Sequence, residues 1–281
     1  MKEPYHILNI EQLVEHEAGG GSMGVVRTDK WLDEEFEKPV RICQKFMESF
    51  LEDNPDKVYN YLRTFGMYKP NRKAFANYQQ MKELKIWDCA EKIFDKYKKQ
   101  WRGPDIPIYI FPIASSNGLF TKQENRKSGV AFKDKLFLFI SPFEDEQELE
   151  ALFVHEYHHI CRLKKQNKRL EEATLLDSII LEGLAEYAVE TCCGKKYRAD
   201  WCNYYTRKEI KNYWEKYIQK DIDVNKNQRL HDEILFGYKG YPKMIGYAAG
   251  YEIVSMFNNK REITIRDSFS LDSKRFLLEM E

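Results

Sequence analysis

The sequence predicts an α+β fold that is mostly helical and carries one small sheet. Segments with the apolar spacing of helices fill residues 31–101 and much of the chain beyond residue 145. Between them, three short apolar runs at 106–111, 128–132 and 136–140 have the composition of strands. A length of 281 residues, 43% of them hydrophobic, is enough for one large domain or two smaller ones.

The helical residues near the start predict an N-terminal region of their own, rich in Lys, Glu and aromatic residues. The expected helices are 31–51, 55–65 and 71–101. Arg102-Gly103-Pro104 interrupts this pattern, because Gly and Pro end helices. We therefore predict an N-terminal helical region at 1–104 and a second domain at 105–281.

Residues 155–159 read His-Glu-Tyr-His-His, an H-E-x-x-H pattern in a chain with only six histidines. On a helix, residues four apart lie about 40° from each other around the axis, so His155 and His159 can bind one metal ion. Glu156 projects from the flank of that face, where it can take a proton from a metal-activated water. The pattern therefore predicts a metal site with Glu156 as its general base.

The surrounding helix places both histidines on an apolar face, together with Leu152 and Ile160. Two core histidines with structural hydrogen bonds are the alternative interpretation. His158 follows His155 by three residues, but its use as a ligand would displace Glu156 from its useful position. We therefore expect His158 to pack on the flank.

A third ligand is expected on a following helix, since two histidines leave a catalytic zinc site one protein ligand short. Residues 174–193 have a helical pattern, with Thr174 or Asp177 as a cap and Gly194 at the end. Glu182 and Glu186 lie four apart in this apolar segment and share a face. Buried carboxylates are costly without a positive partner, so both are candidates, although a solvated helix face is the alternative.

These motifs resemble the glutamate-zincin metallopeptidases, in which H-E-x-x-H is followed by a helix bearing a glutamate ligand. The closer resemblance is to the YjaZ-like family of bacterial predicted zinc-dependent proteases. Its members pair H-E-x-x-H with a downstream D-x-x-x-x-E-G-x-A and a later G-Y-x-x-G-Y. Here the second motif runs from Asp177 to Ala185 and the third occupies 246–251. The resemblance covers roughly residues 106–258.

The resemblance implies a zincin-like metallopeptidase domain with one zinc ion per chain, bound by His155, His159 and Glu182. Glu156 would be the general base, and Glu186 would orient the first histidine. Leu181 stands where better-known families have asparagine before the ligand, so that contact must come from elsewhere. The implied activity is hydrolysis of peptide bonds in a peptide or protein substrate. A non-catalytic zinc-containing protein that binds peptides or regulates is the alternative.

Other site features are expected from the resemblance and from the residues themselves. An edge strand at 129–132 would pair with extended substrate, with an ordinary hairpin strand as the alternative. Tyr247 is the candidate donor to the oxyanion, Tyr251 and His231 are its rivals, and core packing is the alternative for any of them. Gly183 costs helix stability, which indicates the close approach of another element beside the glutamate ligand.

Composition limits the other functions. Equal numbers of basic and acidic residues, 45 each, give no electrostatic footprint for nucleic acid. The start of the chain has no apolar signal segment, and no stretch is long enough to span a membrane. Six cysteines without a disulfide pattern are typical of a reducing cytosol, so we expect a cytoplasmic protein.

Helices expected at 206–220, 242–258 and 270–280 would complete the domain, and the oligomeric state is left open.

Overall fold

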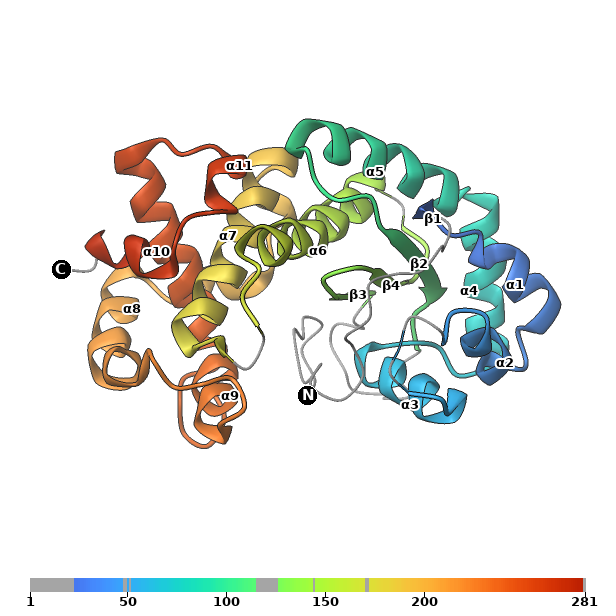
Figure 1. Ribbon diagram of the computed structural model, residues 1–281, viewed down its shortest axis with the longest axis horizontal. Helices are drawn as coiled ribbons and strands as arrows, with labels where there is room; N and C mark the ends of the chain where they lie inside the picture. The colour runs from blue at the N-terminus through green and yellow to red at the C-terminus, as the bar shows by residue number, and fades with distance from the viewer. Residues whose placement is uncertain are drawn as a thin grey trace. The chain divides into compact units, whose positions relative to one another are not determined.

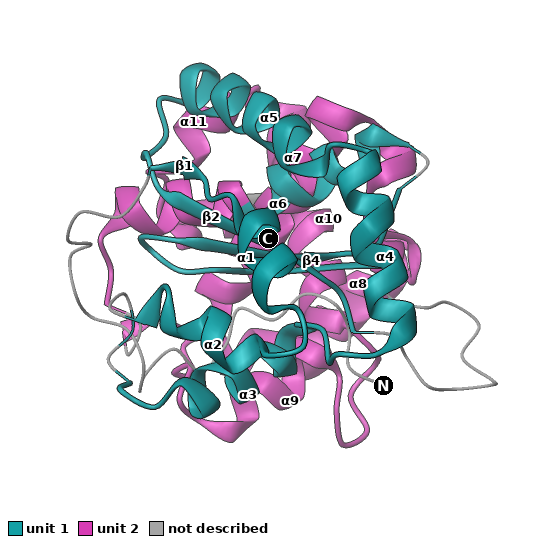
Figure 2. Cartoon of the chain, turned by 90° about the vertical axis from the view of Figure 1, so that its right-hand side faces the viewer, with its two compact units in different colours: residues 1–156 teal, residues 157–281 magenta. Residues whose placement is uncertain are grey.

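The computed structural model describes residues 23–47, 50, 52–114, 126–143, 145–169 and 172–279. The predicted fold class is confirmed in outline: most of these residues are helical, and four strands form one small mixed sheet (Figure 1). By their contacts the residues form two compact units, Met1–Glu156 and Tyr157–Glu281 (Figure 2). The predicted domain boundary near residue 104 lies inside the first of these units and stays a prediction.

The sheet belongs to the first unit. Its strands lie in the order β1 (Gly24–Val25), β2 (Pro107–Pro112), β4 (Leu136–Ile140) and β3 (Lys127–Ala131). β2 is parallel to both of its neighbours, and β3 is antiparallel to β4. All of β2 and β4 is buried, which explains their continuous apolar sequences. The three longer strands were predicted to within one residue, whereas β1 is too short to leave a pattern.

Within its described residues, the first unit also contains five complete helices. They are α1 (Thr28–Glu35), α2 (Pro39–Gln44), α3 (Pro55–Phe65), α4 (Arg72–Glu83) and α5 (Ile86–Trp101). The single helix expected at 31–51 is wrong, because Pro39 cannot continue a preceding helix and instead begins α2. The helix expected at 71–101 is interrupted at Lys85, whose φ of 52° is left-handed. α3 has its predicted bounds, with an Asn54 cap and Gly66 after the last turn.

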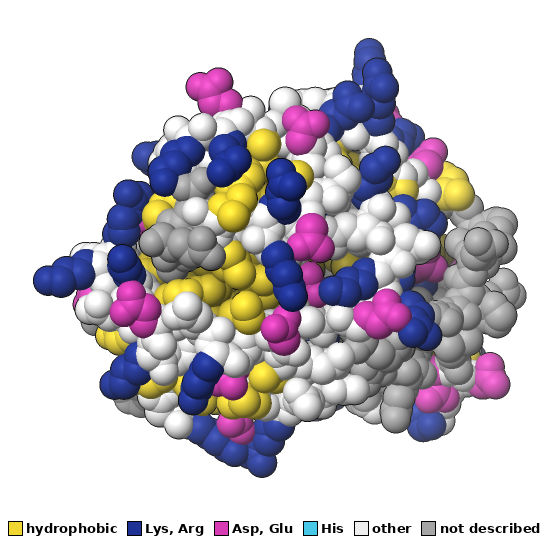
Figure 3. Space-filling view, turned by 60° about the vertical axis from the view of Figure 1, so that its left-hand side comes forward, with side chains coloured by type: hydrophobic (Ala, Val, Ile, Leu, Met, Phe, Trp, Pro, Cys, Tyr) yellow, Lys and Arg dark blue, Asp and Glu magenta, His cyan; other side chains and the backbone are white. Residues whose placement is uncertain are grey.

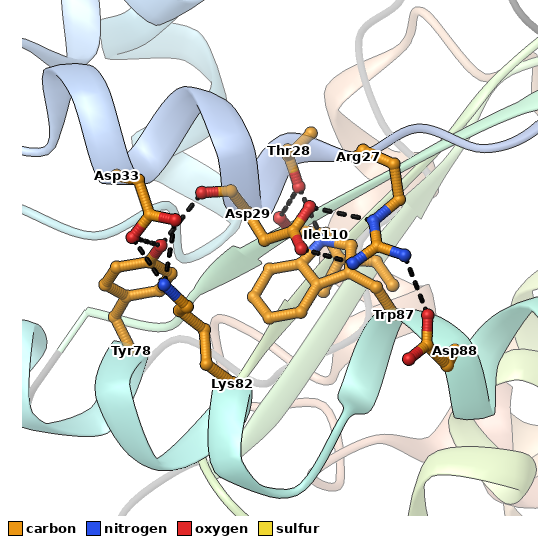
Figure 4. Close-up of polar contacts among 9 residues, drawn as sticks. All are labelled: Arg27, Thr28, Asp29, Asp33, Tyr78, Lys82, Trp87, Asp88 and Ile110. Atoms are coloured by element: carbon orange, nitrogen blue, oxygen red, sulfur yellow. Dashed lines mark hydrogen bonds and ion pairs between the residues drawn. The ribbon is translucent and has the colours of Figure 1, made fainter.

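A polar network connects α1 to the sheet and to the helices that follow (Figure 4). The Thr28 hydroxyl donates to the carbonyl of Ile110 on β2, and it accepts a hydrogen bond of 2.8 Å from Trp87 Nε1 on α5. The Tyr78 hydroxyl on α4 lies 2.6 Å from a carboxylate oxygen of Asp33. Because these partners are far apart in sequence, the network fixes the tertiary arrangement around β2.

The second unit contains the remainder of α6 (Glu146–Gln166), which begins in the first unit. The other helices are α7 (Leu175–Cys193), α8 (Arg207–Tyr213), α9 (Arg229–Phe236), α10 (Ile245–Arg261) and α11 (Ile265–Ser268). α7 begins and ends where the sequence predicted, because Thr174 and Asp177 form a capping box at its start and Gly194 follows its last turn. After α8 the expected helix widens into a π-helix at Trp214–Ile218 and then tightens into a 3₁₀ turn at Gln219–Asp221. The helix expected at 270–280 is a 3₁₀-helix, Ser273–Glu279.

α7 is the core of the second unit. Nearly all of its residues from Leu175 to Val189 are buried, and α10 packs along it. A helix that is apolar all round must be covered on every side, so the buried polar residues that it does carry are exceptional. In the described part of the chain, no helix is both long and apolar enough to cross a bilayer.

Candidate metal centre

The H-E-x-x-H motif lies in the middle of α6, in a stretch that is buried on all faces. The solvent-exposed fractions of His155, Glu156 and His159 are only 1%, 3% and 1%. Ionisable side chains are rarely buried this completely unless they are paired or bind a metal. The helix around them therefore keeps the motif away from bulk water, as predicted from the apolar face.

α7 supplies the third member of the site. Glu182 and Glu186 are each exposed by 1%, so the alternative of a solvated helix face is wrong. Glu182 Oε2 lies 3.7 Å from His159 Nε2, which is too long for a hydrogen bond. A carboxylate on α7 therefore lies close to one of the histidines on α6 without a direct hydrogen bond to it.

His155, His159 and Glu182 form a group that fits a metal ion. One ligand atom from each residue lies within 4.8 Å of the other two. Two atoms held about 2.0–2.2 Å from one zinc ion in a tetrahedron are about 3.4 Å apart, close to the His159–Glu182 separation. Imidazole nitrogens and a carboxylate oxygen are also ligands that zinc accepts, and three protein ligands leave one position open.

Glu186 lies one helical turn beyond Glu182 and holds a neighbouring segment. Its Oε2 accepts a 2.8 Å hydrogen bond from the backbone N–H of Ala199 and lies 3.9 Å from Cys202 Sγ. Burial, and then the charge of Glu186, raises the pKa of the Cys202 thiol, so this cysteine stays protonated at neutral pH. The expected role of Glu186 in orienting a histidine stays a prediction.

His158 is a packing residue, as the sequence predicted. Its Nε2 lies 3.2 Å from Ser268 Oγ, and its ring meets Phe269 edge-on at 5.0 Å between centroids. Nearby, Arg162 donates to the Ser268 carbonyl and, at 3.3 Å, to Ser273 Oγ. Burial lowers the pKa of Arg162 to about 10. These contacts attach the C-terminal segment to α6.

The three candidates for the oxyanion donor have different surroundings. Tyr247 is fully buried, with its ring centroid 5.2 Å from that of Trp201 and 5.6 Å from that of Phe236. Tyr251 instead donates its hydroxyl proton to Glu190 and accepts from Arg198. Tyr251 thus has an evident structural role.

His231 is engaged through both ring nitrogens. Its Nε2 lies 2.9 Å from Ser178 Oγ, and its Nδ1 lies 2.8 Å from Asp232 Oδ1. In the tautomer that carries its proton on Nδ1, His231 donates to the Asp232 carboxylate and accepts from the Ser178 hydroxyl at Nε2. Sequence reasoning did not find Ser178 or Asp232, although Ser178 lies one helical turn before Glu182 and so shares its face.

On the face shown in Figure 3, basic and acidic side chains are interspersed and apolar side chains lie between them. This mixture agrees with the net charge of zero in the sequence. All six cysteines are free thiols.

Fold and site together define a class of protein: a helical α+β chain with a buried His-His-Glu group that suits zinc. Comparison with known families agrees with this class. A family model described as "Predicted Zn-dependent protease (DUF2268)" matches residues 86–278. The chain is also 38% identical over 221 residues to "Uncharacterized protein YjaZ" of Bacillus subtilis (strain 168), across 78% of this chain and 84% of the relative. The chain therefore belongs to this YjaZ-like family of predicted zinc-dependent proteases.

A second relative is more distant. "Uncharacterized protein YjfC" of Bacillus subtilis (strain 168) is 25% identical over 139 residues, 46% of each chain. No solved structure is significantly similar to the chain.

Proposed function

We propose that this protein is a zinc-dependent peptidase with a zincin-like catalytic domain. The observation that carries the proposal is that the buried side chains of His155, His159 and Glu182 lie close enough to bind one metal ion. Glu156 directly follows the first of these proposed ligands in the sequence. His155, His159 and Glu182 would hold one zinc ion. A purely structural zinc site is normally closed by a fourth Cys or His, whereas this group has three protein ligands and an adjacent carboxylate.

Zinc bound by these residues would supply Lewis acidity, lowering the pKa of water to about 7 and polarising a carbonyl. Glu156 would accept the proton of the attacking water and return it to the leaving amine. Glu156 is buried, so its carboxylate has little contact with bulk water. Tyr247, in the segment of α10 that packs along α7, is our candidate for the donor that stabilises the oxyanion.

The substrate would be an extended peptide. β3 is one of the two edge strands of the sheet among the described strands, and its Gly129 lies against Glu156. An edge strand can bind a peptide by backbone pairing, which selects for extended shape more than for sequence. We therefore expect broad sequence tolerance, with a denatured protein as a suitable test substrate. The cytoplasmic location expected from composition stays a prediction.

The test is zinc content together with hydrolysis. Purified protein should carry about one zinc per chain and cleave a denatured protein substrate. Chelation should abolish cleavage, and stoichiometric zinc should restore it. Zinc that stays bound without any cleavage would support a non-catalytic zinc protein, and protein without metal affinity would exclude both functions.

A further inference from the structure

Gly129 in β3 lies unusually close to the side chain of Glu156. A Cβ atom added to Gly129 would be 2.5 Å from Glu156 Cδ and 2.6 Å from both Cγ and Oε1. Real Cβ atoms essentially never come within 3.0 Å of another heavy atom. No amino acid other than glycine therefore fits at residue 129 while Glu156 stays where it is.

The backbone of Gly129 does not by itself require glycine. Its φ lies outside the left-handed region in which side chains are strained. Glycine inside a strand weakens the strand, because it adds chain entropy to the unfolded state and has no side chain to pack. The space occupied by Glu156 is the feature that accounts for a glycine here.

Contacts with β4 and with α6 hold β3 in place. Gly129 is paired with Leu138 on the buried strand β4, and Ser141 donates two hydrogen bonds, of 2.8 and 2.9 Å, to the carbonyl of Arg126 just before β3. Lys127 Nζ donates to the carbonyl of Glu148 on α6 at 3.3 Å. Since side chains alternate along a strand, Lys127 and Gly129 share the face toward α6.

We propose that Gly129 is a positioning residue for Glu156, an inference that rests on the peptidase function proposed above. Glu156 has three rotatable side-chain bonds, and the backbone of β3 forms one wall of the space that confines its carboxylate. A methyl group at residue 129 would push against the flexible end of Glu156 and not against the backbone of another element. The strand should therefore stay in place while the carboxylate moves, and a displacement of about 1 Å can cost about 100-fold in rate.

The experiment compares wild type, Gly129→Ala, Glu156→Ala and the double variant, each with measured zinc content, thermal stability, kcat and KM. Gly129→Ala should keep its zinc and its KM within about two-fold and lose about 100-fold in kcat. In the Glu156→Ala background the added methyl should have no further effect on residual hydrolysis, because the group that it displaces is gone.

Stability gives a second readout that does not need activity. Any stability that Gly129→Ala loses relative to wild type should not be lost when the double variant is compared with Glu156→Ala, because removal of the carboxylate makes room for the methyl group. Wild-type kcat in Gly129→Ala would overturn the positioning role while the peptidase function stands. An equal loss of stability from Gly129→Ala in the wild-type and Glu156→Ala backgrounds would also overturn the positioning role. A zinc-loaded wild type that cleaves no peptide would overturn both the positioning role and the peptidase function.

Discussion

Gly183 on α7 and Gly250 on α10 meet backbone to backbone. A Cβ atom on Gly183 would lie 2.2 Å from the carbonyl carbon and oxygen of Gly250, and one on Gly250 would lie 2.0 Å from the carbonyl oxygen of Ile179. Gly183 follows the candidate ligand Glu182 directly. The close crossing of the two helices therefore sets where Glu182 lies, and it confirms the close approach predicted from Gly183.

Gly183→Ala should destabilise the protein. The obstacle is backbone on both sides, so the helices must separate, and overpacking of this kind typically costs about 1–3 kcal/mol or more. Denaturant unfolding measures the change. Asn259→Ala, on the exposed side of α10, is the matched control and should stay within about 0.5 kcal/mol of wild type. Equal stability of Gly183→Ala and wild type would show that the helices do not cross this closely.

Local signals explain which elements could be predicted. α7 has a capping box at its start and a glycine after its end, and β4 is a continuous apolar run, so the pattern itself marks their bounds. The break at Lys85 has no such signal, because neither Pro nor Gly occupies it. The left-handed turn there depends on how α4 and α5 pack, which a single sequence does not show.

The same distinction applies to the site. His155 and His159 lie on one helix, so their spacing alone predicts a shared metal ion, and Glu182 was found through its motif. The hydrogen bonds of Ser178 with His231 and of Ala199 with Glu186 join residues 53 and 13 positions apart. No periodicity links such pairs, so only the folded chain shows them.

The two glutamates of α7 should respond differently to the same substitution. Glu182→Gln should lose zinc during purification, because an amide is a poor replacement for a carboxylate ligand. Glu186→Gln can still accept the Ala199 N–H bond, so it should keep zinc with affinity lowered by about 10–100-fold. Zinc titration of both variants makes the comparison. Loss of zinc from Glu186→Gln alone would place the ligand one helical turn later.

Tyr247→Phe should lower kcat by about 100- to 1,000-fold with unchanged zinc content, if its phenol donates to the oxyanion. Packing against Trp201 and Phe236 should survive, since the ring is retained. Tyr251→Phe is the matched control and should change stability more than kcat, because it removes the contacts with Glu190 and Arg198. Wild-type kcat in Tyr247→Phe would assign this tyrosine to core packing.

Asp177 should make folding depend on pH. Burial alone would raise the pKa of Asp177, but hydrogen bonds from Lys168, Thr174 and Ser273 outweigh it and hold the pKa below its ordinary value. Its stabilisation is therefore present above about pH 4 and lost as the pH falls through the lowered pKa.

Asp177→Asn should cost about 1–3 kcal/mol at pH 7 and progressively less below pH 4. Denaturant unfolding across this range measures the difference. A difference that is independent of pH would mean that the charge of Asp177 is not what stabilises the start of α7.

Glu156→Gln removes the proposed base while it keeps the shape of the side chain and all three proposed ligands. The measurement is the rate of hydrolysis of a denatured protein by zinc-loaded wild type and variant, at equal zinc content. We expect cleavage by the wild type and a loss of about 1,000-fold or more in the variant. A variant that carries the same zinc and cleaves as fast as the wild type would show that Glu156 is a structural residue and that another group is the base.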